Sequence, residues 1–217
     1  MESNHSRWIA KTAYPPGTVP AMGLERFAAH LCALTGQATL LDRVHATEMN
    51  ASGVLSNITS GQIQVGDLYC GGLRKHAPVL ALSTRPFRAH STAAARALAA
   101  SCRPAYEESL RALGVRLLYM TAWPPTGLWS AQQIESLQDL NGLRLRTYDD
   151  LSARVFRGAG AHAVELPIKN AVEQLGTGQL NGILSSGDGA AGSAFREFLP
   201  YFYDIRYAIP LCFVVMT

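Results

Sequence analysis

The sequence predicts an α/β protein with parallel strand pairing. Two observations lead to this fold class. Strand-like segments alternate with segments whose apolar residues recur at helical spacing, and Gly or Pro separates most of them. The first part of the chain has the order strand, helix, strand, helix, strand over residues 7–14, 24–34, 38–45, 52–60 and 63–69. With 217 residues, 48% of them hydrophobic, the chain is long enough for one large domain or two small ones.

Local signals set the boundaries of these first elements. The first strand stops at Pro15–Gly17, a turn-forming stretch. The first helix is predicted because apolar residues recur at helical spacing from Leu24 to Leu34, and Gly36 ends it. Gly61 separates the weaker second helix from the apolar third strand. Strands joined by helices in this way are expected to pair in parallel.

The middle of the chain is predicted to contain two helices and then a strand. Ser91 is placed to cap the first helix, and Pro104 is placed to begin a second helix that runs to Gly114. A strand follows over residues 115–122. The next stretch, Trp-Pro-Pro-Thr-Gly, interrupts the pattern, so we expect a domain boundary near residues 120–125.

The last third of the chain again alternates between the two patterns. Ser136 and Asp139 form a capping-box pattern before a short turn. Asp149 or Asp150 can cap one helix, and Asn170 can cap the next. Strands are predicted over residues 143–147, 162–166, 182–186, 202–209 and 211–217.

Composition and missing motifs argue against several classes of function. The net charge is only +3 and the basic residues are scattered, which argues against nucleic-acid binding. No apolar run approaches the roughly 20 residues of a membrane span, and residues 1–17 lack the apolar core of a secretory signal. Phosphate-binding loops, a nucleophile elbow and paired zinc-type histidines are absent, so we expect no catalysis, cofactor or metal. The four cysteines are widely spaced and are predicted to be buried thiols, Cys32, Cys70, Cys102 and Cys212.

Three predicted strand ends carry residues suited to binding a small molecule. The strand Leu-Arg-Leu-Arg-Thr alternates, so its leucines face one side and Arg144 and Arg146 face the other. Arg146 is nearer the strand end, where ligands bind in open α/β sheets, and its guanidinium matches a carboxylate. Ser185 and Ser186 end a second strand, and Trp123 follows a third. Each residue alone also has a structural explanation, a surface ion pair for the arginine and core packing for the tryptophan.

These residues lie within motifs that resemble a known family, the DctP-type solute-binding proteins of TRAP (tripartite ATP-independent periplasmic) transporters. The most specific match is the pattern S-L-x-D-L-x-G-L-x-x-R over residues 136–146, followed by a helix that ends L-x-T-G-x-L at residues 175–180. Further matching segments are residues 12–18, 61–68, 85–87, 114–129, 171–186 and 201–217.

The resemblance implies a periplasmic-binding-protein-like fold, of type II-like topology, with two α/β lobes that close on a ligand. The first lobe would span residues 1–122 and the second residues 123–210. Residues 211–217 would form a hinge strand that returns toward the first lobe. The chain would be truncated at its C-terminus, leaving the first lobe incomplete, and would lack the family's signal peptide. Such a chain is expected to be less stable than a completed one and to self-associate.

The resemblance also implies which residues bind the substrate. The family's carboxylate-clamping arginine falls on Arg146, its second-lobe polar contact falls on Ser185, and Trp123 would line the pocket wall. Neighbouring residues in the matching motifs are added to this set. The candidate substrate-binding residues are Arg146, Trp123, Ser185, Ser186, Tyr14 and Phe87.

The function implied is that of a non-enzymatic, periplasmic subunit. It would bind a small organic acid in the inter-lobe cleft and deliver it to TRAP membrane subunits, without spanning the membrane or binding nucleic acid. Keto acids, aromatic acids and dicarboxylates all remain open as ligands. Two alternatives also remain open. One is a truncated or degenerate family member that binds nothing, and the other is a small α/β enzyme with an unrecognised site.

Overall fold

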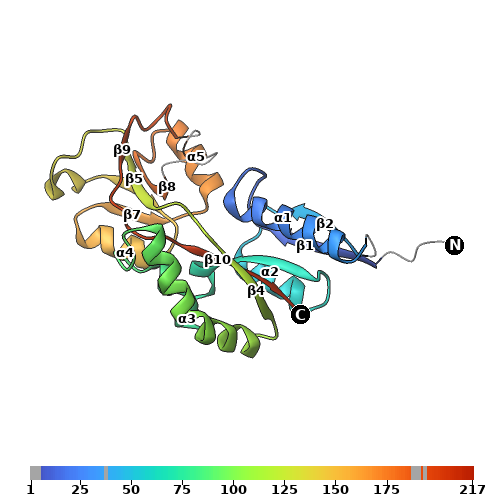
Figure 1. Ribbon diagram of the computed structural model, residues 1–217. Helices are drawn as coiled ribbons and strands as arrows, with labels where there is room; N and C mark the ends of the chain where they lie inside the picture. Colours follow the sequence, from blue (N-terminus) through green and yellow to red (C-terminus); the bar gives the residue numbers. More distant parts are fainter. Residues whose placement is uncertain (1–5, 37–38, 187–191, 193–194) are drawn as a thin grey trace. The chain divides into compact units, whose positions relative to one another are not determined.

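A computed structural model of the protein (Figure 1) describes residues 6–36, 39–186, 192 and 195–217. Contacts within the chain divide it into two units. The first contains the described residues up to Ser83 together with Arg96–Trp123 and Pro210–Thr217. The second contains Thr84–Ala95 and the described part of Pro124–Ile209.

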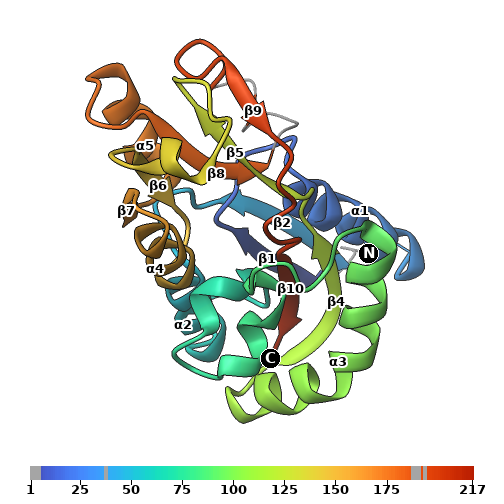
Figure 2. The ribbon, with the colours of Figure 1, turned by 90° about the vertical axis from the view of Figure 1, so that its left-hand side faces the viewer.

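The first unit is built on a five-stranded mixed sheet. Its strands are β1 (Ser6–Thr12), β2 (Thr39–His45), β3 (Val65–Tyr69), β4 (Arg116–Ala122) and β10 (Leu211–Met216). The strand order is β2-β1-β3-β10-β4. β1 pairs in parallel with both β2 and β3, as the sequence predicts, whereas β10 is antiparallel to both of its neighbours. Figure 2 shows the red arrow of β10 beside β4.

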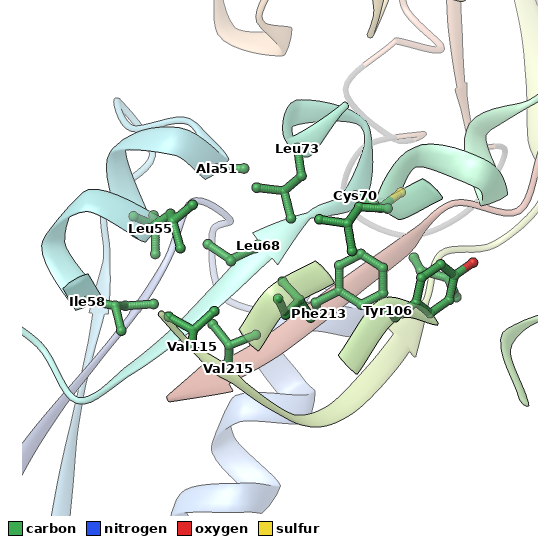
Figure 3. Packing of buried hydrophobic residues seen from close by; sticks show 14 of the residues in the cluster. Ala51, Leu55, Ile58, Leu68, Cys70, Leu73, Tyr106, Val115, Phe213 and Val215 are labelled. Carbon is green, nitrogen blue, oxygen red and sulfur yellow. The ribbon is translucent and has the colours of Figure 1, made fainter. Parts of the chain in front are cut away.

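Helices cover both faces of this sheet. They are α1 (Val19–Leu34), α2 (Ala51–Thr59) and α3 (Thr92–Ala112), with the short 3-10 turns η1 (Cys70–Leu73) and η2 (Pro78–Thr84). On one face, Phe213 of β10 packs with Leu68 of β3 and with side chains of α2 and α3. The rings of Phe213 and Tyr106 lie 5.0 Å apart (Figure 3). On the other face, Val214 packs with Leu24 of α1. The alternation of strand side chains therefore gives this unit a core on each face.

The second unit has a five-stranded mixed sheet of its own. Its strands are β5 (Thr126–Ser130), β6 (Arg144–Thr147), β7 (His162–Glu165), β8 (Gly182–Ser186) and β9 (Tyr201–Tyr203). The order is β7-β6-β8-β5-β9. β6 is parallel to β7 and β8, and β5 is antiparallel to β8 and β9. Because β6 and β8 are parallel, their carboxyl ends lie at the same edge of the sheet.

Two helices cover the faces of the second sheet. They are α4 (Asp150–Gly158) and α5 (Ile168–Gly176), and the short 3-10 turn η3 (Leu137–Leu140) precedes β6. Phe156 of α4 packs on the face that carries Leu145 and Leu184. Leu175 of α5 packs on the face that carries Ile183. As predicted, Asp149 caps α4, and the capping box at residues 136–139 is present before η3.

Two predicted helix boundaries are wrong. A single helix, α3, passes through Pro104, where the sequence predicted two. Pro104 has no N–H to donate within the helix. The helix is nevertheless continuous, because Ala99 before the proline and Tyr106 and Leu110 after it pack in the same core. Asn170 does not cap α5, because the helix already begins at Ile168.

Strand β5 was not predicted. Its sequence follows two prolines and contains Gly127, which together indicate a turn. In the structure all five residues of β5 are buried between β8 and β9. Gly127 is required there, because a Cβ atom would lie 2.3 Å from the ring of Phe202. The predicted strand over residues 202–209 is reduced to β9, and residue 38 of the predicted second strand lies outside the described residues.

The division into units differs from the predicted lobe boundaries. Residues 84–95 belong to the second unit, where the Phe87 N–H donates to the Tyr207 carbonyl at 2.8 Å. Trp123 belongs to the first unit, where its N–H donates to the Pro210 carbonyl at 2.9 Å. Residues 211–216 form β10, an internal strand of the first sheet that pairs along both of its edges.

Two further expectations concern surfaces and thiols. Among the described residues, no helix has the length and apolar character needed to cross a bilayer. All four cysteines are free, but only Cys70 and Cys212 are buried, while Cys32 and Cys102 are partly exposed. The prediction of buried thiols is therefore correct for the two that lie in or beside the first sheet.

We expect Phe213→Ala to lower the free energy of unfolding by about 3–5 kcal/mol, because it removes a fully buried ring from between two helices and the sheet. Leu34→Ala serves as the control, because that side chain is 88% exposed and its loss should change stability by less than about 0.5 kcal/mol. Urea denaturation followed by circular dichroism measures both. Equal effects would contradict the central place of β10 in the core.

Candidate functional site

Arg146 is a buried arginine on β6. Its side chain is only 7% exposed, whereas Arg144 on the same strand face is exposed. The Arg146 Nε–H donates to the Leu166 carbonyl at 2.7 Å, and Nη1 donates to the Leu184 carbonyl at 3.2 Å. These two main-chain carbonyls come from either side of β6 and fix the plane of the guanidinium. As the sequence predicts, Arg146 lies near the carboxyl end of a strand, and its side chain bonds to main-chain carbonyls on both sides of that strand.

Strand register places Ser185 on the same sheet face as Arg146. Arg146 is the register partner of Ile183 in β8, and Ser185 is two residues farther along, on the same side. Ser186 lies on the opposite side with Leu184 and is buried. The Ser186 carbonyl accepts a hydrogen bond from Trp129 Nε1 at 3.1 Å. Of the two candidate serines, Ser185 is therefore the one placed to act with Arg146.

Phe87 is exposed and lies in the second unit. It is 53% exposed and has a backbone φ of 58°, a left-handed conformation that costs energy for a bulky residue. Its ring meets Tyr207 edge-on, with centroids 5.8 Å apart. Phe87 is thus held by its backbone and by one aromatic contact.

Tyr14 and Trp123 form a pair in the first unit. Their rings meet edge to face, with centroids 4.8 Å apart and an interplanar angle of 68°. Tyr14 follows the carboxyl end of β1, and Trp123 follows the carboxyl end of β4. The Tyr14 carbonyl also lies 2.7 Å from His45 Nδ1. The structure therefore brings together two residues that the sequence predicted separately.

A buried polar group lies behind this aromatic pair. Trp123 Nε1 donates to the thiol sulfur of Cys212 at 3.3 Å. The Thr12 hydroxyl donates to Asp67 Oδ2 at 2.9 Å and accepts from the Tyr14 N–H at 3.3 Å. Asp67 is 1% exposed, and its Oδ1 has no hydrogen-bond partner among the described residues.

Burial dominates the electrostatics of this group. It raises the pKa of Asp67 to about 7, while the Thr12 hydroxyl and the Cys212 thiol act in the opposite direction. Burial also raises the pKa values of Tyr14 and Cys212 well above their usual range, so both stay neutral at physiological pH. A carboxyl that titrates near neutrality is unusual and marks this group as a functional candidate.

The sequence analysis did not single out Asp67 or Thr12. Asp67 stands inside the mostly apolar stretch Ile-Gln-Val-Gly-Asp-Leu-Tyr, and an acidic residue at an inward-facing strand position is the signal that could have found it. Its inward direction depends on the register of β3 with β1 and β10. That register comes from pairing of segments far apart in sequence.

Two further features of the described residues concern metal binding and surface cavities. No group of three or more His, Cys, Asp or Glu side chains that could hold a metal ion occurs among the described residues. A shallow surface cavity of about 310 Å³ in the first unit is lined by four residues outside the predicted set, Glu107, Arg111, Arg116 and Leu117.

Comparison with known proteins decides the family. Residues 12–216 match the DctP family model, described as bacterial extracellular solute-binding protein, family 7. The chain belongs to the DctP family. The resemblance to this family, which the sequence motifs indicated, is therefore confirmed over almost the whole chain.

Solved DctP-type proteins share the fold. The protein is similar to Bordetella pertussis DctP7, an extracytoplasmic solute receptor that binds pyroglutamic acid, with 23% identity and a TM-score of 0.90. It is also similar to DctP6 of the same organism, another pyroglutamic acid receptor, with 26% identity and a TM-score of 0.89. In both comparisons the match covers 97% of this chain and 70% of the other. A TRAP periplasmic solute-binding protein from Sulfitobacter with bound β-D-galacturonate shows 18% identity and a TM-score of 0.86, over 97% of this chain and 72% of that one.

These findings confirm three predictions. The chain is a DctP-type solute-binding protein, it has the expected mixed α/β fold, and it belongs to a family of receptors and not of enzymes. The family is extracytoplasmic, and three of the similar solved proteins bind pyroglutamic acid, β-D-galacturonate and L-gulonate respectively.

We expect the free energy of unfolding to fall as pH rises from about 4 to about 7. The folded state binds the Asp67 proton more tightly than the unfolded chain, so stability from this group is present below the unfolded pKa and is lost as pH approaches the folded one. The loss should be at most about 4 kcal/mol. Asp67→Asn keeps the shape without the titration, so urea denaturation should show a smaller decline. A stability difference between the two proteins that does not vary with pH would contradict the titration of Asp67.

Proposed function

We propose that the protein binds a small organic acid outside the cytoplasm, for uptake by TRAP membrane subunits, and that Arg146 holds the ligand carboxylate. The observation that carries this proposal is the buried, oriented guanidinium on β6. The main-chain carbonyls of Leu166 and Leu184 orient its Nε and Nη1 atoms, and a ligand carboxylate would complement its charge.

The geometry of Arg146 suits a carboxylate for two reasons. Its planar group can make parallel hydrogen bonds to both oxygens of a carboxylate, which adds orientation to the charge attraction. The carbonyls of Leu166 and Leu184 already hold that plane, so less conformational entropy is lost on binding. Burial in addition lowers the local dielectric constant and strengthens the ion pair.

The remaining candidate residues have supporting roles in this proposal. Ser185 shares the sheet face of Arg146 and offers a hydroxyl that can donate or accept. Trp123 and Tyr14 supply an aromatic surface for the apolar part of the ligand. Phe87 is exposed enough to contact a ligand as well.

Pyroglutamate is the first ligand to test. DctP6, a solved relative with 26% identity to this chain, binds pyroglutamic acid. The other classes to include are a keto acid, an aromatic acid, a dicarboxylate and galacturonate. Isothermal titration calorimetry against this panel tests the proposal. If none of these acids binds, the alternative of a family member that binds no organic acid is favoured.

Arg146→Lys should weaken binding of the best ligand by about 2–5 kcal/mol, because lysine keeps the charge but loses the paired hydrogen bonds. Arg144→Lys is a closely matched control. Arg144 lies on the same strand face and also donates to two carbonyls, those of Gln179 and Gly178, but it is exposed. Calorimetry should therefore show a loss only at Arg146. Equal losses, or none at Arg146, would remove it from the site.

Ser185→Ala should weaken binding by about 0.5–1.5 kcal/mol, the net contribution of a neutral hydrogen bond. Ser186→Ala should leave affinity unchanged, because that side chain faces the opposite side of the sheet. The same calorimetric titration measures both variants. The reverse order of effects would show that the ligand lies on the other face of β8.

A further inference from the structure

Asp67 is connected to the Tyr14–Trp123 pair by two separate routes. The first route passes from Asp67 Oδ2 through the Thr12 hydroxyl to the Tyr14 main-chain N–H, with distances of 2.9 and 3.3 Å. The second starts at the Cys212 thiol, which stabilises the ionised form of Asp67 and accepts the Trp123 indole N–H at 3.3 Å. The edge-to-face contact between the rings of Tyr14 and Trp123 joins the two routes.

No positive charge that would hold Asp67 in its ionised form is evident among the described residues that face it. From β1 and the turn after it come Thr12 and Tyr14, from β10 comes Cys212, and from β4 comes Tyr119, which feels the Asp67 charge. Cys70 follows β3, and its buried thiol acts electrostatically on Tyr14. These groups are hydroxyls, phenols and thiols.

Two other elements border this group of residues. On the neighbouring strand β2, the imidazole-bearing His45 is the register partner of Thr12. Helix α1 packs Leu24 and Ala28 against this sheet face. Lys11 lies on the other side of β1, where its ammonium group bonds to Asn57 at 2.8 Å.

We propose that Asp67 is a positioning residue for organic-acid binding: when protonated it holds Tyr14 and Trp123 in the binding arrangement, and loss of its proton weakens binding. This inference rests on the proposed function for its effect on affinity. It assigns to the first unit a proton-dependent control of the aromatic surface that would contact the ligand.

The physical reason lies in the unpartnered oxygen. A neutral carboxyl tolerates an apolar surrounding, but an ionised one needs donors or water at Oδ1. The two donors that stabilise the ionised form, the Thr12 hydroxyl and the Cys212 thiol, also contact the aromatic pair. Because the Thr12 hydroxyl already donates to Oδ2, ionisation either draws these two groups closer to Asp67 or admits water at Oδ1, and each change displaces Tyr14 and Trp123.

A ligand-free measurement tests the positioning role directly. Trp8→Phe and Trp129→Phe leave Trp123 as the only tryptophan, whose emission is followed from about pH 5 to about pH 9. We expect a step with a midpoint near pH 7 that is absent in Asp67→Asn. Thr12→Val should move the midpoint upward, because it removes a donor that stabilises the ionised form, and it provides a second test if Asp67→Asn fails to fold. His45→Gln should leave the step in place.

Calorimetry with pyroglutamate tests the effect on affinity. Binding should be about tenfold weaker at about pH 8.5 than at about pH 5.5, and Asp67→Asn should remove most of that difference. An emission step that persists in Asp67→Asn, or that is lost in His45→Gln, would overturn the proposal. Absence of pyroglutamate binding at both pH values would count against the proposed ligand and the affinity effect, while the ligand-free emission would still decide the positioning role.

Discussion

The insertion of β10 between β3 and β4 is the constraint on which the first unit depends. β10 is antiparallel to both neighbours and bonds along both of its edges, so β4 joins the sheet only through it. Its alternating side chains also fill both cores, with Phe213 on one face and Val214 on the other. At its start, Cys212 contacts the indole of Trp123, which sets the aromatic pair beside Asp67. One strand near the end of the chain thus completes the fold and positions the candidate site of this unit.

In the second unit, main-chain carbonyls play the corresponding positioning role. Arg146 and Arg144 are two residues apart on one strand face, and each donates to a pair of carbonyls from neighbouring segments. They differ in exposure, because Arg146 lies deeper along β6 and aligns with the buried residue Ile183. Hydrogen bonds to main-chain carbonyls therefore orient both guanidinium groups. At the buried Arg146 they set the plane in which a carboxylate could pair with it.

Local patterns predicted the parts of the fold and site that depend on local chemistry. The parallel β1, β2 and β3, the Asp149 cap and the strand-end position of Arg146 follow from periodicity and capping. β5 was missed because its own sequence resembles a turn, and it forms a strand only by pairing with β8 and β9, which are distant in sequence. Asp67 was missed for a related reason, since its burial is decided by pairing with β1 and β10 and not by its own neighbours in sequence.

The chemistry of Asp67 separates a structural role from a proton-dependent one. Asparagine has nearly the same shape and could accept the same hydrogen bond from Thr12, without the energetic penalty of a buried acid. Hydrogen bonding to Thr12 alone therefore gives no reason for a carboxyl at this position. What an aspartate adds is a charge that appears near neutral pH, at a place where the donors that could stabilise it are also those that hold Tyr14 and Trp123. A buried group that lowers stability while it controls an aromatic surface is the combination expected where folding and function make opposing demands on one residue.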